Sequence, residues 1–181
     1  MRGRLSNQVK IAVLAGLSFM LLFLPHIPIF PPAPFLTYDL SDIPALIGGF
    51  ALGPLSGIAV VIVKNLLVLI HRFDPLHIVG LPMNAVAGCA LVGVSSWYYW
   101  RNKSLRAAVA GLFLGTAAMA AVMIPANYLI FDTFMKIMHL TPSFSATFYV
   151  FAFAVPFNLL KGLLSSVLAF LIYKRVSAVL K

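Results

Sequence analysis

The sequence predicts an all-α integral membrane protein with six transmembrane helices, and three observations lead to this fold class. The 181 residues are 62% hydrophobic and only 9% charged, whereas a soluble domain carries about 25% charged residues. Apolar runs long enough to span a bilayer recur along the chain. Most of the cations lie in short patches that flank these runs, as in the cytoplasmic loops of membrane proteins. We therefore expect residues 1–181 to form a single transmembrane domain.

The apolar runs give the predicted helices in chain order. Four of them are clear, at residues 11–24, 81–100, 107–131 and 144–173. The segment 43–70 would extend roughly 42 Å as one helix, which is too long for a span without strong tilt. It contains Gly53 followed by Pro54, which is a turn signal. We therefore expect two helices here, with a break between Gly53 and Pro54.

The positions of the cations decide the number of spans. With five spans and a cytoplasmic amino terminus, Arg101, Lys103 and Arg106 would lie outside, against the positive-inside rule. With six spans, these residues share the cytoplasmic side with the cations near both chain ends. We therefore predict six spans and two cytoplasmic termini, with the first run retained as a helix because it lacks a small-residue cleavage site. The terminal cations are Arg2, Arg4, Lys10, Lys174, Arg175 and Lys181.

The six-helix count places every acidic residue and every histidine on the external side. The first external connection, residues 25–42, carries five prolines between Pro25 and Pro34 and cannot be a helix. It is also apolar, so we expect it to form a lid over an external site. The acids and histidines gathered on this side are Asp39, Asp42, Asp74, Asp132, His26, His71, His77 and His139.

A few polar side chains lie within the predicted spans, where an ionisable residue is a functional candidate. Asn158 and Lys161 share one helix face, because they are three residues apart, and Pro156 would kink that helix. Together with Asn127, they are suited to hydrogen-bond a flat heterocycle. The alternatives are interhelical hydrogen bonds for the asparagines and snorkelling for the lysines, Lys64 included. The full set is Lys64, Asn65, Asn84, Asn127, Asn158 and Lys161.

Several kinds of site are excluded or disfavoured. The sequence has no phosphate-binding loop and no other nucleotide-binding motif, which excludes a self-powered ATPase. Its cations lack the aromatic neighbours typical of nucleic-acid binding. His71, Asp74 and His77 have a spacing that suits zinc, but Pro75 breaks any helix that would align them, so we expect no metal site. Cys89, the single cysteine, is expected to be a small buried hydrophobe.

Small residues gather near the cytoplasmic end of the first helix. Ala12 and Gly16 are four residues apart, and Ala15 and Ser18 lie beside them. Small residues at this spacing let a second helix approach closely. The spacing leaves open whether that helix is an internal neighbour or an external partner.

Five stretches carry a resemblance to a known family. They are FPPAPFLTYDLSDIPALIGGFALGPLSG, VKNLL, GLPMNAVAG, MIPANYLI and PFNLLKG, which follow one another over nearly the whole chain. In this order they resemble the riboflavin-specific S components, the substrate-binding subunits, of energy-coupling factor (ECF) vitamin transporters. Members of that family have six helices and two cytoplasmic termini, the topology that the charges predict independently.

The resemblance implies a binding site as well as a fold. Riboflavin would enter from outside, into a cavity between the fourth, fifth and sixth helices that the loop after the first helix closes. Asn127, Asn158 and Lys161 would meet the polar edge of the isoalloxazine ring, and Asn84 would belong to the pocket wall. The residues of the lid would be Leu36, Thr37, Tyr38 and Asp39.

The resemblance also implies partners. An S component docks on a transmembrane T component driven by two cytoplasmic ATPase subunits, and topples in the membrane to release the vitamin inside. No cofactor is implied beyond riboflavin as the transported ligand. The docking signature of the family is Ala-x-x-x-Ala on the first helix, and this sequence departs from it, since Ala12 is followed by Gly16 and Ala15 by Phe19.

Other functions remain as alternatives at this point. The ligand of an S component in a prokaryotic plasma membrane would be riboflavin, or else FMN, thiamine or another small heterocycle. An intramembrane enzyme is a different class, but the sequence shows no nucleophile and base paired at a helical spacing. A channel or a self-sufficient facilitator is a further class, but the sequence shows no repeat between its two halves and no recognisable selectivity filter.

Overall fold

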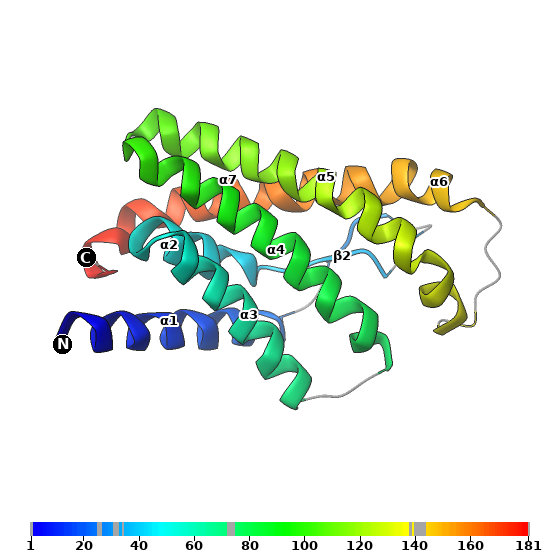
Figure 1. The fold of residues 1–181 in the computed structure, drawn as a ribbon, viewed down its shortest axis with the longest axis horizontal. Coiled ribbons are helices and arrows are strands. Elements are labelled where there is room, and N and C mark those ends of the chain that lie inside the picture. The colour runs from blue at the N-terminus through cyan, green and yellow to red at the C-terminus, as the bar shows by residue number, and fades with distance from the viewer. Residues whose placement is uncertain are drawn as a thin grey trace.

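The computed structural model describes residues 2–24, 27–30, 33, 35–71, 75–137, 139 and 144–180. These residues form helices connected by short segments (Figure 1). The helices are α1 (Arg2–Leu21), α2 (Asp42–Leu52), α3 (Pro54–His71), α4 (Pro75–Asn102), α5 (Leu105–Ile137), α6 (Ala146–Tyr149), the π-helix η1 (Val150–Ala154) and α7 (Val155–Leu180). Because α6, η1 and α7 follow one another without a gap, they form one rod, and the described chain has the six rods predicted from sequence.

The predicted break between α2 and α3 is confirmed. Gly53 has a φ of 109°, a backbone conformation that favours glycine, and its N–H donates to the carbonyl of Gly49 to close α2. Pro54 then begins α3, where its missing N–H is harmless. The two residues therefore end one helix and start the next within a single turn.

The helices differ in how much of a membrane they can cross. Four are long and apolar enough to span a bilayer: Pro54–His71, Ile78–Asn102, Leu105–Ile137 and Ala146–Tyr173. Two shorter apolar helices are Asn7–Leu21 and Asp42–Leu52. The 11 residues of α2 extend only about 16 Å, which is half of a hydrocarbon core of about 30 Å. The predicted count of six helices therefore holds, and α2 is a half-length helix.

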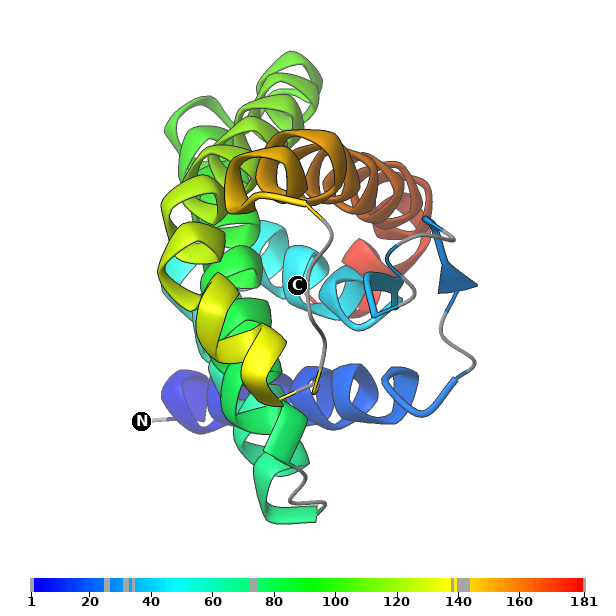
Figure 2. The ribbon, with the colours of Figure 1, turned by 90° about the vertical axis from the view of Figure 1, so that its right-hand side faces the viewer.

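The ends of the rods sort as the charge pattern requires. Figure 1 shows the free ends of α1 and α7, the α2–α3 junction and the α4–α5 turn at one end of the bundle. The turn carries Arg101, Lys103 and Arg106, so the three basic patches of the sequence share this end. Figure 2 views the opposite end, where the chain that leads into α2 lies between α1 and α7, and α3, α4 and α5 form the other side of the bundle.

The chain between α1 and α2 takes the place of a second half-helix. It contains a two-residue antiparallel pairing of β1 (Ile27–Pro28) with β2 (Thr37–Tyr38). Ile27 and Pro28 are exposed, whereas Ala33, Tyr38, Asp39 and Ser41 are buried, so the later part of this segment enters the bundle. Non-helical backbone at membrane depth is tolerated where protein covers it.

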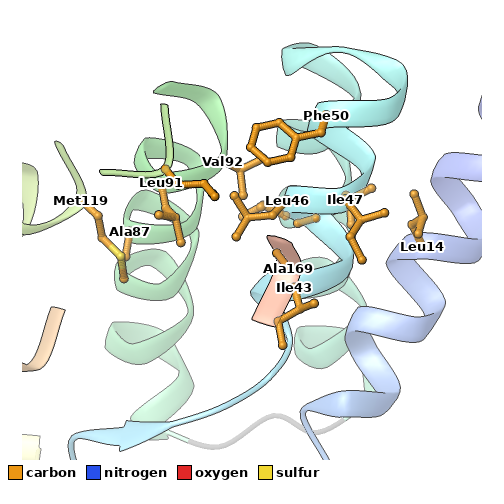
Figure 3. Packing of buried hydrophobic residues seen from close by; sticks show 14 of the residues in the cluster. Leu14, Ile43, Leu46, Ile47, Phe50, Ala87, Leu91, Val92, Met119 and Ala169 are labelled. Carbon is orange, nitrogen blue, oxygen red and sulfur yellow. The ribbon is translucent and has the colours of Figure 1, made fainter. Parts of the chain in front are cut away.

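The hydrophobic core centres on α2. Every residue of α2 from Asp42 to Phe50 is buried, among α1, α3, α4 and α7 (Figure 3). Leu46 is fully buried there, together with Leu91 of α4. A helix enclosed on all sides can be short, because its neighbours rather than lipid surround it.

Glycines bring α4 and α5 into backbone contact. A Cβ at Gly111 would lie 2.6 Å from the carbonyl oxygen of Ser95, and one at Gly115 would lie 2.5 Å from that of Leu91. Neither position has room for a side chain. The pair forms a G-x-x-x-G face, which lets two helices approach closely in a membrane.

Candidate functional site

A cavity of about 500 Å³ lies in the half of the bundle opposite the termini. Its walls come from the last turn of α3, the first half of α4, the second half of α5, the first half of α7 and the loop that precedes α2. Leu22 and Phe23, just after α1, border it as well. This volume is within the range of small-molecule sites, about 300–1,000 Å³.

The structure brings most of the predicted site residues together around this cavity. Seven of the eight line it: Leu36, Thr37, Asp39, Asn84, Asn127, Asn158 and Lys161. Tyr38 does not line it. The Tyr38 side chain is buried, and its phenol oxygen accepts a hydrogen bond from the Ser165 hydroxyl at 3.4 Å, which attaches the loop to α7.

Asn127 and Asn158 present matching amides to the cavity. Each Nδ2 donates to the carbonyl four residues earlier, at 2.7 Å to Met123 and 2.8 Å to Ala154. Such a bond fixes the orientation of an amide but uses only one of its two N–H groups and leaves its oxygen available. No other hydrogen bond of these two amides is found within the described part of the chain, so both retain a donor and an acceptor for a ligand.

Lys161 lies at the base of the cavity in a polar cluster. Its Nζ donates to Asp39 Oδ2 and to Asn84 Oδ1, both at 3.0 Å, and lies 3.5 Å from Asp42 Oδ2. Asn84 Nδ2 in turn donates to Asn65 Oδ1 at 3.4 Å. The carboxylate of Asp39 offsets the charge of Lys161. Both members of this ion pair line the cavity.

Lys64 forms the second ion pair of this cluster, so of the two readings left open by the sequence, snorkelling is the wrong one. Its side chain is fully buried, and its Nζ donates to Asp42 Oδ1 and, at 2.6 Å, to Ser41 Oγ. Asp39 Oδ1 accepts from both the backbone N–H and the hydroxyl of Ser41. Two lysines and two aspartates therefore form a buried cluster with no net charge.

The cluster also corrects the placement of two acids. Asp39 and Asp42 were expected in an external connection, but both lie inside the bundle, where they face the lysines of α3 and α7. Asp132 and His139 are exposed at the end opposite the termini, as expected. His71 lines the cavity, with its ring 5.7 Å from that of Phe19. His26 and Asp74, and the side chain of His77, lie outside what the structure describes, and no metal cluster occurs among the described residues.

Aromatic side chains form another wall of the cavity. Phe131 and Tyr149 line it with their rings 5.4 Å apart, and Phe35 and Phe134 meet edge to face at 4.9 Å. Phe157, which follows the π-helix η1 and Pro156, lines the cavity next to Asn158. Rings in such a wall offer flat apolar surface to a planar ligand.

The small residues of α1 separate into two faces. Ala12 is exposed, and a Cβ at Gly16 would have nothing within 4 Å, so both lie open on the outside. Ala15 is fully buried and belongs to the hydrophobic core, as does Leu14. The prediction that Ala15 belongs to a partner-docking face is therefore corrected, and the candidate face contains Ala12 and Gly16 alone.

Fold and cavity together define a multi-pass membrane protein that encloses a small-molecule site within a helical bundle. The model of one family, the ECF transporter substrate-specific component, matches residues 7–173. The chain belongs to this family, as its sequence motifs suggested. It is therefore a transporter subunit and not an intramembrane enzyme.

Individual relatives agree with this assignment. The riboflavin transporter RibU of Streptococcus thermophilus is 35% identical over 179 residues, which cover 94% of this chain and 82% of that protein. The riboflavin transporter FmnP of Bacillus subtilis is 33% identical over 176 residues, which cover 94% of this chain and 91% of that protein. A solved structure of the S component of a bacterial ECF transporter superimposes with a TM-score of 0.84 at 29% identity and covers 100% of this chain and 99% of that one.

Proposed function

We propose that this chain captures riboflavin from the external side of the membrane and delivers it to the cytoplasm as part of an ECF-type importer. The observation that carries the proposal is the cavity in the half opposite the termini, with the Asn127 and Asn158 amides beside an aromatic wall. Several relatives that match nearly the whole chain are riboflavin transporters, which supports the same ligand.

The chemistry of the cavity suits an uncharged flat ring system. Isoalloxazine has an apolar face and an edge of alternating donors and acceptors. The free N–H and oxygen of each amide would meet that edge, and Phe131, Tyr149 and Phe157 would supply apolar surface. Lys161 lies beside the amides, and we propose that it approaches the same edge while its ion pair with Asp39 persists.

The charge of the cavity favours riboflavin over the alternative ligands. Its lysine is paired with an aspartate, so the lining has no unpaired carboxylate for the thiazolium cation of thiamine. It likewise offers no unpaired ammonium to the phosphate of FMN within the described lining. Burying an unpaired charge is strongly unfavourable, so we expect riboflavin to bind more tightly than either.

Transport requires partners in this proposal. The sequence has no nucleotide-binding motif, so we propose that two cytoplasmic ATPase subunits act through a T component. The T component would approach the open face of α1 at Ala12 and Gly16. Both termini would lie in the cytoplasm, at the end of the bundle that carries the three basic patches.

A flavin titration of the purified chain tests the proposal. We expect riboflavin to quench its own fluorescence on binding at a one-to-one ratio without ATP, and FMN and thiamine to compete poorly. A preparation that binds thiamine but not riboflavin would keep the transporter class and overturn the ligand. A preparation that binds neither flavin nor thiamine would remove the cavity as a site for these vitamins.

A further inference from the structure

A second, smaller cavity lies between α5 and α7, in the half of the bundle that holds the termini. It is an apolar groove of about 150 Å³. Leu112, Thr116 and Ser166 line it and are buried, so they form its floor. Phe113 and Leu171 also line it and are 63% and 60% exposed, so they form its rims. In a bilayer these rims face hydrocarbon, and the groove has the polarity of an acyl chain.

Each of the two helices, α5 and α7, carries an arginine next to the groove on the side of the termini. Val109 lines the groove on α5, and Arg106 precedes it by three residues. Leu171 lines it on α7, and Arg175 follows it by four residues. Residues three or four apart lie on one helix face, so each rim continues into an arginine, and both arginines are exposed.

The packing of α5 against α7 puts these arginines at the same depth. Thr116 Oγ1 and Ser166 Oγ lie 3.4 Å apart, which fixes the register of the antiparallel pair. Both helices rise 1.5 Å per residue. About ten residues beyond this contact toward the termini, Arg106 of α5 is therefore level with the part of α7 that holds Arg175.

Within the described part of the chain, no acidic side chain lies at this depth. The only acidic residues of the sequence are Asp39, Asp42, Asp74 and Asp132. Asp39 and Asp42 are buried in the ion-pair cluster, and Asp132 lies near the far end of α5. Asp74 lies outside the described residues. It directly precedes α4 in sequence, whereas the α4–α5 turn follows that helix. A mobile anion in the membrane is the natural partner for the two arginines.

We propose that the α5–α7 groove and its two arginines bind one anionic phospholipid of the cytoplasmic leaflet. The phosphate lies between Arg106 and Arg175, and one acyl chain fills the groove along Val109, Phe113, Val167 and Leu171. Basic pockets between transmembrane helices on the cytoplasmic side bind such head groups. The site uses the cytoplasmic position of the termini but does not depend on which vitamin the first cavity binds.

Native mass spectrometry of the full chain, purified in detergent and stripped of lipid, tests the site. Phosphatidylglycerol and phosphatidylcholine with the same acyl chains are titrated separately. We expect one phosphatidylglycerol to bind with a preference of about 25-fold, or about fivefold for each arginine. The double variant Arg106→Gln/Arg175→Gln should lose the preference.

A matched control removes the same charge from the same end of the molecule. The Arg101 guanidinium lies 3.8 Å from the centre of the Trp97 ring, and the Lys103 ammonium lies 4.0 Å from that of Trp100. The double variant Arg101→Gln/Lys103→Gln should therefore keep the preference. Equal losses in the two double variants would overturn the site, because they would indicate a diffuse surface charge.

A further variant tests the groove apart from the arginines. Val167→Trp should fill it and weaken the binding of both lipids, while glycerol phosphate without acyl chains should not compete. The melting temperature of each variant shows that the fold is intact. Equal binding of the two lipids by the unmodified chain overturns the proposal. So does unchanged lipid binding by Val167→Trp together with lost uptake in the full transporter, which would make the groove a protein-docking surface.

Discussion

At the scale of single residues, the buried lysines show how the loop before α2 is held. Lys64 and Lys161 reach Asp42 and Asp39 from helices on different sides of that loop. Burial of each charged group is unfavourable by itself, and the attraction of its oppositely charged partner offsets that cost. The two pairs together hold the loop in one position beneath the cavity.

We expect Lys64→Met to destabilise the protein strongly. Losing one member of a buried ion pair typically lowers the free energy of unfolding by about 3–5 kcal/mol, because the other charge stays buried and unpaired. The double variant Lys64→Met/Asp42→Asn should recover part of the loss. Thermal unfolding in nanodiscs measures both, and a double variant no more stable than the single one would show that the pairing contributes little.

We expect Asn158→Leu to weaken riboflavin binding by roughly 5- to 150-fold, because an unsatisfied buried group on the ligand is unfavourable by about 1–3 kcal/mol. Asn127→Leu should act in the same direction. Ser96→Ala is the matched control, since Ser96 is buried and bonds the backbone of Val92 but does not line the cavity. Flavin affinity unchanged in both asparagine variants would place the binding site elsewhere.

The sequence predicted the cavity residues better than the ion pairs. Lys64, Asn84, Asn127, Asn158 and Lys161 stand out because polar residues are rare in apolar helices. Their partners were harder to find, because Asp39 and Asp42 lie in a proline-rich loop that the helix count places outside. The sequence contained one signal. An apolar loop is expected to pack inward, and its two aspartates are then available to pair with the two lysines of the apolar helices.

At the scale of elements, close contact between backbones decides which helices pair. Gly111 and Gly115 let α5 approach α4 so closely that the carbonyls of Ser95 and Leu91 occupy the space of a side chain. Charge and hydropathy could not predict this register. The register of α5 against α4 depends on which small residues face each other, and only the structure shows that.

We expect Gly115→Ala to destabilise the protein, even though alanine favours helices by about 1 kcal/mol relative to glycine. The added Cβ would lie 2.0 Å from Ser95 Oγ and 2.5 Å from a backbone oxygen, so the helices must separate. Gly16→Ala is the control, because a Cβ there meets nothing within 4 Å. A lower melting temperature for the first variant and an equal or higher one for the second would agree with this view; equal melting temperatures would contradict it.

The half-length of α2 could be predicted only in part from the sequence. Gly53 and Pro54 marked its end correctly, since glycine and proline chemistry is local. Its length depends on the loop that enters the bundle from the other side, and on the core that surrounds Leu46 and Phe50. Such tertiary enclosure leaves no periodic signal in the sequence.

At the scale of the whole molecule, the bundle has two ends with different tasks. One end holds the cavity, and the other holds the basic patches. The open positions Ala12 and Gly16 lie on α1 between the two ends, and neither lines the cavity. Capture and docking can therefore be changed separately, because the two sets of residues do not overlap.

We expect Gly16→Trp to abolish uptake while leaving riboflavin binding by the purified chain intact. The open space around Gly16 accommodates the ring within the monomer, whereas a partner helix could no longer approach. Ala15→Trp should instead impair folding, because Ala15 lies in the core. Retained uptake with Gly16→Trp would move the docking surface away from this face of α1.

The topology can be tested with a thiol reagent that does not cross the membrane, after replacement of the half-buried Cys89. A cysteine at Ser56, next to the α2–α3 junction, should be protected in intact cells. A cysteine at Thr147, exposed near the opposite end, should react. Ser143, which the predicted spans place in an external connection, lies outside the described residues. Labelling at position 56 from outside would overturn the cytoplasmic assignment of the termini.

The half-length of α2 has a consequence for how the nascent chain enters the membrane. A helix of 11 residues is too short to be inserted as a span of its own, and the single charges of Asp42 and Lys64 each oppose insertion by about 3 kcal/mol. With the proposed cytoplasmic termini, α3 would cross in the opposite direction if the insertion machinery passed over α2, and the arginines after α4 would emerge outside. We therefore expect α2 and α3 to insert as one hairpin, in which the charges of Asp42 and Lys64 neutralise each other.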